Sequence, residues 1–324
     1  LHHPWRNNRR SQGEPEMSAV TDIALGLPTR KRKQIDTPMD EMVKAYGDVP
    51  ERSFRYCPGC GLGMAQSALM RAFDRLELDP AKIATAGGSG CYSPMGHYFQ
   101  SSHIHGSHGR ACAYATGLKL ARPELTVITL QGDGDNLSIG GNHFIHAARR
   151  NIDITVICFN NFGFGDTGGQ FGPTTPLGSV TETSNAGMPE AAFDGCKLAI
   201  GAGATFVARS TVAHPAHLTK MMTDAIAWKG FSYVEVLQNC HVFWGKRNGM
   251  PQAMDMLKFY KDNSVRSTDT PEEDWYDIPV YAENEKNIKF VLGVLHKEER
   301  AEFSEQYANL RKAAMAAASQ GVMA

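Results

Sequence analysis

Short apolar runs alternate with amphipathic segments along most of the chain. The runs are four to six residues long, rich in Val, Ile and Thr, and bounded by Gly, Asn or Pro, which is typical of buried strands. Between them, apolar residues recur every three or four positions, which predicts helices that bury one face. This alternation predicts an α/β fold, with a doubly wound and mostly parallel sheet. The predicted strands are 83–86, 125–130, 154–159, 205–208 and 233–237, and the predicted helices are 65–76, 109–120, 137–150, 191–200, one beginning at Pro215, and 298–318.

The two ends of the chain differ from this central pattern. Residues 1–50 are polar and show no sustained periodicity, so we expect a flexible N-terminal arm, with order beginning near Tyr56. Residues 51–250 form the predicted α/β domain. Residues 251–324 are charged and aromatic, and we expect a C-terminal extension that wraps the core or a partner.

Composition excludes several classes of protein. The 324 residues carry a formal net charge of −1, which gives no electrostatic argument for binding nucleic acid or an anionic membrane. Basic residues cluster at 6–10 and 30–33, where we expect a solvated tail. No apolar stretch approaches the roughly 18 residues that cross a bilayer, and no secretory signal is visible. Seven cysteines suit a reducing cytoplasm, where cysteine often serves metal or redox chemistry.

The segment 132–170 holds the strongest candidate chemistry. Gly132, Asp133 and Gly134 follow one predicted strand, and Asn161 follows the next, within a β-α-β unit. Both loops therefore lie at the carboxyl ends of parallel strands, where α/β sheets bind ligands. The side-chain oxygens of Asp133 and Asn161, with a backbone carbonyl at Gly163, make a half-shell for Mg²⁺, which prefers oxygen ligands and takes phosphate oxygens and water as the rest.

The same loops predict a diphosphate site. The backbone N–H groups of Gly134 and Asp135 enter a helix and can face an anion, and the Thr167 hydroxyl can donate to a phosphate. A Gly-Asp-Gly sequence alone is also an ordinary turn. The prediction rests on the combination with Asn161 and the glycine-rich loop that follows it.

At this point the sequence resembles a known family. The GDG loop with the later asparagine pair resembles the diphosphate motif of thiamine diphosphate enzymes. The sequence DTGGQ at 166–170 is similar to the β subunits of 2-oxoacid:ferredoxin oxidoreductases, and SIGGNHFIHAARRNI is similar to their 2-oxoglutarate branch. The resemblance covers about residues 55–244. It implies a sheet of the thiamine diphosphate-binding type.

Cys57 and Cys60 form a CxxC that has several readings. A thioredoxin-like motif would have a strand before it, and a zinc site would usually have a second CxxC; neither is present. Cys91 and Cys240 each follow a predicted strand, so their loops can converge with the CxxC at one sheet edge. Four thiolates arranged in this way suit a [4Fe–4S] cluster. The family has CPGCG and two later cysteines at matching positions, which supports this set.

The other three cysteines have different predicted roles. Cys112 and Cys158 fall inside a predicted helix and strand, where a buried structural thiol is expected. Cys196 is the alternative fourth cluster ligand.

Histidines concentrate in a predicted loop, with His97, His103, His105 and His108 within twelve residues. Zinc is one possibility, but no i, i+4 pair with a carboxylate accompanies them, and a hydrogen-bonded polar loop is the alternative. The resemblance implies catalytic roles for His108, in contact with substrate, and for Arg110, which would receive a carboxylate or phosphate. A polar loop without such roles remains open.

The resemblance implies a specific activity. Thiamine diphosphate, Mg²⁺ and one [4Fe–4S] cluster would serve the CoA-dependent oxidative decarboxylation of a 2-oxoacid, or its reversal, with electrons passing to ferredoxin. Local similarity to the 2-oxoglutarate branch favours 2-oxoglutarate over pyruvate. Residues 92–95 depart from the basic residue that pyruvate-using members often carry, so this loop does not itself assign the substrate. An α subunit would bring the pyrimidine-binding domain, in an (αβ)₂ assembly. Alternatives are a cluster-free thiamine enzyme subunit, a zinc-binding scaffold and a thiamine-free redox protein.

Overall fold

The computed structural model describes residues 38–47, 55–275 and 289–319. Contacts divide the chain into two units, Leu1–Met39 and Asp40–Ala324, and nearly all of the described residues belong to the second. The basic clusters at 6–10 and 30–33, and most of the predicted N-terminal arm, lie outside the described residues.

A mostly parallel sheet forms the centre of the second unit. Its eight strands, among the described residues, run in the order β2-β1-β3-β4-β6-β5-β8-β7. All neighbouring pairs are parallel except β5 and β8. The strands are β1 (Ile83–Gly87), β2 (Ser102–His105), β3 (Thr126–Gly132), β4 (Thr155–Asn160), β5 (Phe206–Thr211), β6 (Ser232–Leu237), β7 (Ser264–Arg266) and β8 (Phe290–Lys297).

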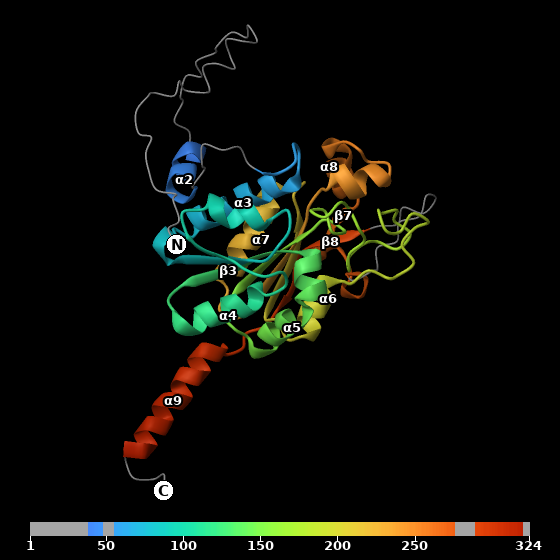
Figure 1. Cartoon of the computed structure of the whole chain (residues 1–324). Coiled ribbons are helices and arrows are strands. Elements are labelled where there is room, and N and C mark those ends of the chain that lie inside the picture. The colour runs from blue at the N-terminus through green and yellow to red at the C-terminus, as the bar shows by residue number, and fades with distance from the viewer. Residues whose placement is uncertain (1–37, 48–54, 276–288, 320–324) are drawn as a thin grey trace, which may run out of the picture. The chain divides into compact units, whose positions relative to one another are not determined.

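Helices cover both faces of this sheet (Figure 1). One face packs against α3 and α7, and the other against α4, α5 and α6. Successive strand residues point to opposite faces, so Ile157 of β4 enters one core while Val156 and Cys158 enter the other. Burial on both faces explains why the strands read as continuous apolar runs. The helices are α3 (Gly61–Arg75), α4 (Ala111–Ala121), α5 (Gly141–Arg150), α6 (Gly195–Gly201) and α7 (Pro215–Ala227).

The remaining helical elements lie before, between and after these. Short helical turns at Ser93–Tyr98, Gly134–Ile139 and His241–Gly245 follow strand ends near the candidate site. Three further helices are α2 (Pro38–Tyr46), α8 (Ala253–Asp262) and α9 (Phe303–Ser319). No helix in the described ranges has both the length and the apolar character that crossing a membrane requires.

The structure confirms the predicted fold class but differs from the expected limits of order. Helix α2 lies within the predicted arm, and Met42 and Tyr46 are buried in the core, with the Tyr46 ring 6.0 Å from that of Phe73. Met42 and Tyr46 are a single apolar pair at positions i and i+4, and one such pair is too short a pattern to predict a helix. The C-terminal segment supplies β7 and β8 to the sheet rather than only wrapping it, because the apolar run of β8 covers the outer edge of β5.

Two predicted elements change character. Part of the histidine-rich loop is the edge strand β2, which pairs in parallel with β1. Its polar composition hid the strand from the sequence pattern, and pairing with β1 overrides that local preference. The predicted helix 137–150 divides into the turn Gly134–Ile139 and helix α5.

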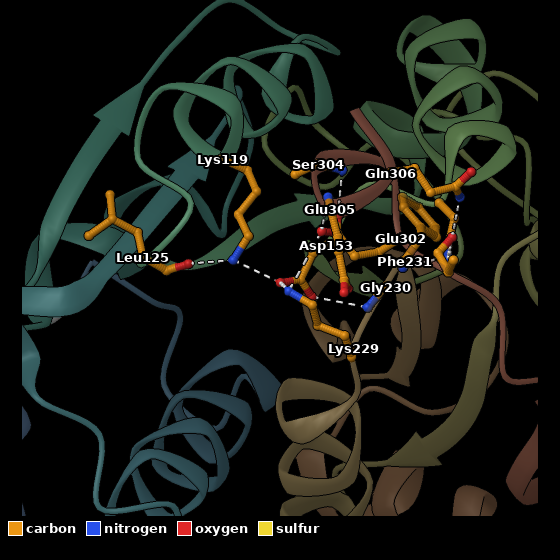
Figure 2. Close-up of polar contacts among 12 residues, drawn as sticks. Lys119, Leu125, Asp153, Lys229, Gly230, Phe231, Glu302, Ser304, Glu305 and Gln306 are labelled. Carbon is orange, nitrogen blue, oxygen red and sulfur yellow. Dashed lines mark hydrogen bonds and ion pairs between the residues drawn. The ribbon is translucent and has the colours of Figure 1, made fainter. Parts of the chain in front are cut away.

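A polar network ties the start of α9 to the amino-terminal ends of the strands (Figure 2). The Lys119 ammonium group lies 2.8 Å from the carbonyl oxygen of Leu125 and 2.8 Å from the Asp153 carboxylate. Lys229 lies 3.1 Å from Asp153 and 3.7 Å from Glu302. The Glu302 carboxylate also accepts hydrogen bonds from two backbone N–H groups in the first turn of α9. The network therefore fixes where α9 begins.

Candidate active site

A cavity lies at the carboxyl ends of β1, β3, β4 and β6, where the predicted loops meet. It is lined by Gly132, Asp133, Gly134, Asp135, Asn161, Gly163 and Thr167, together with His108 and residues 89–92. All the predicted diphosphate and magnesium residues therefore come together at one edge of the sheet.

Three oxygen positions face one another inside this cavity. The amide atom of Asn161 on this side lies 2.7 Å from the carbonyl oxygen of Gly163 and 3.1 Å from Oδ1 of Asp133. Without a cation, the NH₂ group of Asn161 would occupy this position and donate to both. Octahedral Mg²⁺ with ligands at 2.0–2.1 Å sets neighbouring ligand oxygens about 2.9 Å apart. The two separations from Asn161 thus match neighbouring ligand positions of a magnesium site when the amide oxygen points inward.

Asp133 is the buried charge of this group, with 2% of its surface exposed. Burial raises the pKa of its carboxyl to about 7, while a hydrogen bond from Thr174 opposes that rise. The Thr174 hydroxyl lies 2.5 Å from Oδ2 of Asp133 and 2.8 Å from Oδ1 of Asn160. A carboxylate held this way has one oxygen occupied by Thr174 and the other directed toward Asn161.

The two asparagines of the pair have different structural roles. Asn161 faces the cavity, whereas Asn160 shapes the loop: its Oδ1 accepts from the backbone N–H of Phe162 at 3.1 Å, and its Nδ2 donates to Glu235 at 3.0 Å. Glu235 is itself buried and accepts from Arg209 at 2.5 Å. This chain of contacts fixes the turn that presents Asn161 and Gly163, where φ is +66° at Phe162.

Asp135 acts through its side chain as well as through its position in the loop. Its Oδ1 accepts hydrogen bonds from the backbone N–H of Gly109, at 2.6 Å, and from Nδ1 of His108, while Oδ2 accepts from Gln131 at 2.9 Å. A Cβ at Gly88 would lie 2.4 Å from this carboxylate, so the neighbouring strand end approaches it closely. Asp135 therefore orients His108, whose Nε2 remains as the atom available to the cavity.

The remaining predicted residues differ in position. Thr167 lines the cavity and lies 2.5 Å from Oε1 of Gln170. Arg110 is exposed, does not line the cavity, and donates from Nη1 to the carbonyl oxygen of His108 at 2.8 Å. Its role stays a prediction. Gly134 lies under the ring of Phe164, where an added Cβ would lie 2.1 Å from a ring carbon.

The four predicted cluster cysteines line one neighbouring cavity, although they are far apart in sequence. The amide of Asn239 donates to the carbonyl oxygen of Gly59 at 2.9 Å, and the backbone N–H of Gly61 donates to Asn239. These contacts hold the CxxC turn against the residue that precedes Cys240. Gly165 belongs to the wall of both cavities, and an added Cβ there would lie 3.5 Å from Sγ of Cys91 and 3.7 Å from Sγ of Cys240.

The electrostatics of these thiols suit a metal. All four are free cysteines. Burial, with repulsion from the neighbouring thiols, raises the pKa of Cys60 to about 11. Burial also raises the pKa of Cys91 to about 12 and raises that of Cys240, where Asp166 and Asp133 respectively add to the repulsion from the thiols. Thiolates become stable in such a place only beside positive charge, which a bound iron–sulfur cluster supplies.

The other cysteines do not line this cavity. Cys112, Cys158 and Cys196 are fully buried in the second core, and Cys196 lies 3.7 Å from a Glu235 oxygen. The structure therefore favours Cys240 over Cys196 as the fourth residue of the set.

Sequence reasoning missed three residues that build the site: Thr174, Gln131 and Phe164. Thr174 lies in a long loop that the sequence marked as functional by its length, but nothing there distinguished one threonine from its neighbours. Gln131 was hidden inside a strand. In the sequence, Phe164 is a hydrophobic residue in a loop. Its role is apparent only from the close approach of its ring to Gly134.

Comparison with known families defines the class of protein. Residues 74–236 match the thiamine pyrophosphate enzyme family, in its C-terminal TPP-binding domain. This span contains the diphosphate loop, the asparagine pair and the parallel strands β1 and β3–β6.

Relatives narrow the class further. The chain is 42% identical over 251 residues to the 2-oxoglutarate synthase subunit KorB of Methanocaldococcus jannaschii, covering 78% of this chain and 90% of that protein. It is 40% identical over 232 residues to the 2-oxoglutarate oxidoreductase subunit KorB of Mycobacterium tuberculosis, covering 70% of this chain and 62% of that one. A solved 2-oxoglutarate:ferredoxin oxidoreductase from Magnetococcus marinus superposes with a TM-score of 0.71 at 30% identity, over 87% of this chain and 92% of that chain. The chain belongs to the β subunits of the 2-oxoacid:ferredoxin oxidoreductases, in the 2-oxoglutarate branch.

Proposed function

We propose that this chain is the thiamine diphosphate- and cluster-binding subunit of a 2-oxoglutarate:ferredoxin oxidoreductase. The reaction is the CoA-dependent oxidative decarboxylation of 2-oxoglutarate, or the carboxylation of succinyl-CoA in reverse. Support comes from the KorB relatives, and from the Magnetococcus marinus enzyme, which was solved with 2-oxoglutarate, coenzyme A and succinyl-CoA bound.

One observation carries the proposal: the oxygen groups that would hold Mg²⁺ and the four cysteine thiols line two adjoining cavities that share residues. Asn161 lies beside Asp133 and Gly163, and a Cβ added at Gly165 would lie 3.0 Å from Nδ2 of Asn161, 3.5 Å from Sγ of Cys91 and 3.7 Å from Sγ of Cys240. A cluster-free thiamine enzyme would leave the group of four thiols without a function. A zinc scaffold would leave the oxygen groups of Asp133, Asn161 and Gly163 without a function.

The residues of this chain then have distinct tasks. When bound, thiamine diphosphate supplies the carbon nucleophile and the electron sink for decarboxylation. Asp133, Asn161 and the Gly163 carbonyl would hold Mg²⁺ against its diphosphate, while the backbone N–H groups of Gly134 and Asp135 and the Thr167 hydroxyl would donate to phosphate oxygens.

His108 is the candidate for proton movement. Asp135 holds its Nδ1, so Nε2 can donate to or accept from a substrate oxygen in the cavity. Arg110, exposed beside it, is a candidate for binding an anionic group of the substrate or of coenzyme A.

Cys57, Cys60, Cys91 and Cys240 would hold one [4Fe–4S] cluster, which accepts electrons singly and delivers them to ferredoxin. Cys57 is exposed at one side of their cavity, so the cluster would lie near the surface where ferredoxin can approach.

The described cavity is incomplete as a thiamine site. Thiamine enzymes use a glutamate beside the aminopyrimidine, and none of the residues lining this cavity is a glutamate. An α subunit would supply it from a pyrimidine-binding domain, with the active site between the chains. We therefore propose an (αβ)₂ assembly.

The test is activity of the anaerobic complex. We expect this chain, co-expressed with its α subunit, to reduce ferredoxin or a viologen dye with 2-oxoglutarate and coenzyme A. Asp133→Ala should abolish reduction while leaving iron bound, and Cys91→Ala should lower the iron content.

The alternatives give different results. Reduction with pyruvate alone would overturn the proposed substrate and retain the chemistry. A complex without iron that still binds thiamine diphosphate would indicate a cluster-free thiamine enzyme. Bound zinc at the cysteines without thiamine diphosphate would indicate a scaffold.

A further inference from the structure

Three histidines outside the cavity form a compact group. His97 lies in the helical turn Ser93–Tyr98, and His103 and His105 lie on the edge strand β2. One ring nitrogen from each can be chosen so that all three lie within 4.8 Å of one another. The rings of His97 and His103 have centroids 4.8 Å apart, and those of His97 and His105 stack at 6.0 Å.

His103 has an unsatisfied nitrogen. Its Nδ1 lies 2.8 Å from the hydroxyl of Thr85, a fully buried residue of β1, whereas its Nε2 is buried and has no hydrogen-bond partner. If Nδ1 carries the proton and donates to Thr85, Nε2 presents a lone pair with no donor. A histidine that binds a metal commonly has this arrangement, with the second nitrogen held by an oxygen of the protein.

The backbone makes room for this ring. A Cβ at Gly96 would lie 2.1 Å from Nδ1 of His103, and a Cβ at Gly87 would lie 3.4 Å from its Cε1. The imidazole therefore occupies a slot between the end of β1 and the helical turn, and it cannot swing away without disturbing both.

We propose that His97, His103 and His105 form a zinc site with three imidazole ligands and one position open to water. Three histidines with an open fourth position are a known zinc arrangement, with Zn–N distances of about 2.0–2.1 Å. Tetrahedral ligands at that distance are about 3.3 Å apart, closer than the 4.8 Å limit within which these nitrogens lie. His97 and His105 are exposed, so rotation of their side chains can close this gap.

The ion would have a structural consequence for the active site. In sequence, the three histidines lie between Cys91, which is a proposed cluster ligand, and His108. In the described sheet, β2 is an edge strand that pairs only with β1. Zinc would join β2 to the turn Ser93–Tyr98. It would therefore restrain the segment between Cys91 and His108.

The test uses the anaerobic complex of the full chain with its α subunit. We expect one zinc ion per chain by elemental analysis after gel filtration with equimolar Zn²⁺. X-ray absorption at the zinc edge should show nitrogen neighbours at about 2.0–2.1 Å and no sulfur at about 2.3 Å. His103→Gln and His97→Gln should remove the ion. Thr85→Val should weaken zinc binding by about tenfold to hundredfold, as loss of a supporting contact does.

His146→Gln is the matched control, because His146 is exposed on α5 and lies outside the group. It should bind zinc as the wild type does, and iron content should be equal in every variant. His97 is exposed, so His97→Gln tests the ligand without disturbing the core. Absence of stoichiometric zinc, sulfur in the absorption spectrum, or zinc retained in His97→Gln and His103→Gln would overturn the proposal.

Discussion

Thr174→Val tests how the chain keeps the buried Asp133 carboxylate ionised for the proposed Mg²⁺ site. Valine has nearly the shape of threonine, so the change removes a hydroxyl from a residue that is 2% exposed and leaves the packing intact. The Thr174 hydroxyl lies 2.5 Å from Asp133 and lowers the pKa of that carboxyl, which burial has raised to about 7. Without the hydroxyl, we expect the pKa to rise further.

The size of the effect follows from the contacts. A hydrogen bond to a charged group contributes about 1.5–3 kcal/mol. The single Thr174 proton is shared with Asn160, at 2.8 Å, so the lower value applies. About 1.5 kcal/mol corresponds to about one pKa unit, which near pH 7 lowers the ionised fraction of Asp133, and with it the Mg²⁺ affinity, by about fivefold. Because the loss comes from protonation of Asp133, it should shrink as the pH rises toward 9.

The assay is a titration of the complex with Mg²⁺ at saturating thiamine diphosphate, followed by tryptophan fluorescence at several pH values. Thr174→Ser keeps the hydroxyl and should bind Mg²⁺ within about twofold of the wild type, a difference below 0.5 kcal/mol. Equal losses in the serine and valine variants, or a loss independent of pH, would refute the role of this hydrogen bond.

Three further predictions concern stability and the metal sets. Burial lowers the pKa of His217 to about 4. The fold therefore keeps its full stability above pH 6.5 and loses stability as the pH falls from 6.5 toward 4, because the unfolded chain binds the proton more tightly. Discounted for the partial exposure of His217, the loss of stability is about 1–2 kcal/mol. His217→Gln should therefore flatten the decline of Tm between pH 6.5 and 5, and a parallel decline in both proteins would contradict this. Cys240→Ala should lower bound iron while Cys196→Ala leaves it unchanged, as measured by iron per chain; the reverse result would reassign the fourth ligand. Gly134→Ala should lower Tm, by the equivalent of about 1–3 kcal/mol of overpacking against Phe164, and weaken binding of thiamine diphosphate in calorimetry.

The strands of the central sheet could be predicted from sequence because they are buried on both faces. In β4, polar residues do not alternate with Val156, Ile157 and Cys158, so the apolar run is continuous. The predicted limits of β4 are within one residue of the observed limits. The edge strand β2 could not be predicted, since a polar run acquires strand structure only by pairing with β1.

Within the candidate site, residues with distinctive spacing were predictable and residues with common chemistry were not. Asp133 and Asn161 follow strands that the pattern placed side by side, so their meeting followed from topology. Thr174 reaches Asp133 across 41 positions through an irregular loop, and no local pattern encodes that contact. Glu235 looked like an ordinary strand residue until Asn160 and Arg209 were seen to hold it.

Gly165 bears on how fast this enzyme can work. Its backbone lines both the cavity that contains Asp133 and the cavity that contains the four thiols, and it carries no side chain to project toward Asn161, Cys91 and Cys240. Electron tunnelling slows steeply with every added ångström. In the proposed holoenzyme, electrons would pass between the two cavities at this point, where a side chain on Gly165 would lie 3.0 Å from Nδ2 of Asn161 and 3.5 Å from Sγ of Cys91. The absence of a side chain at Gly165 would then keep the two proposed cofactor sites close together.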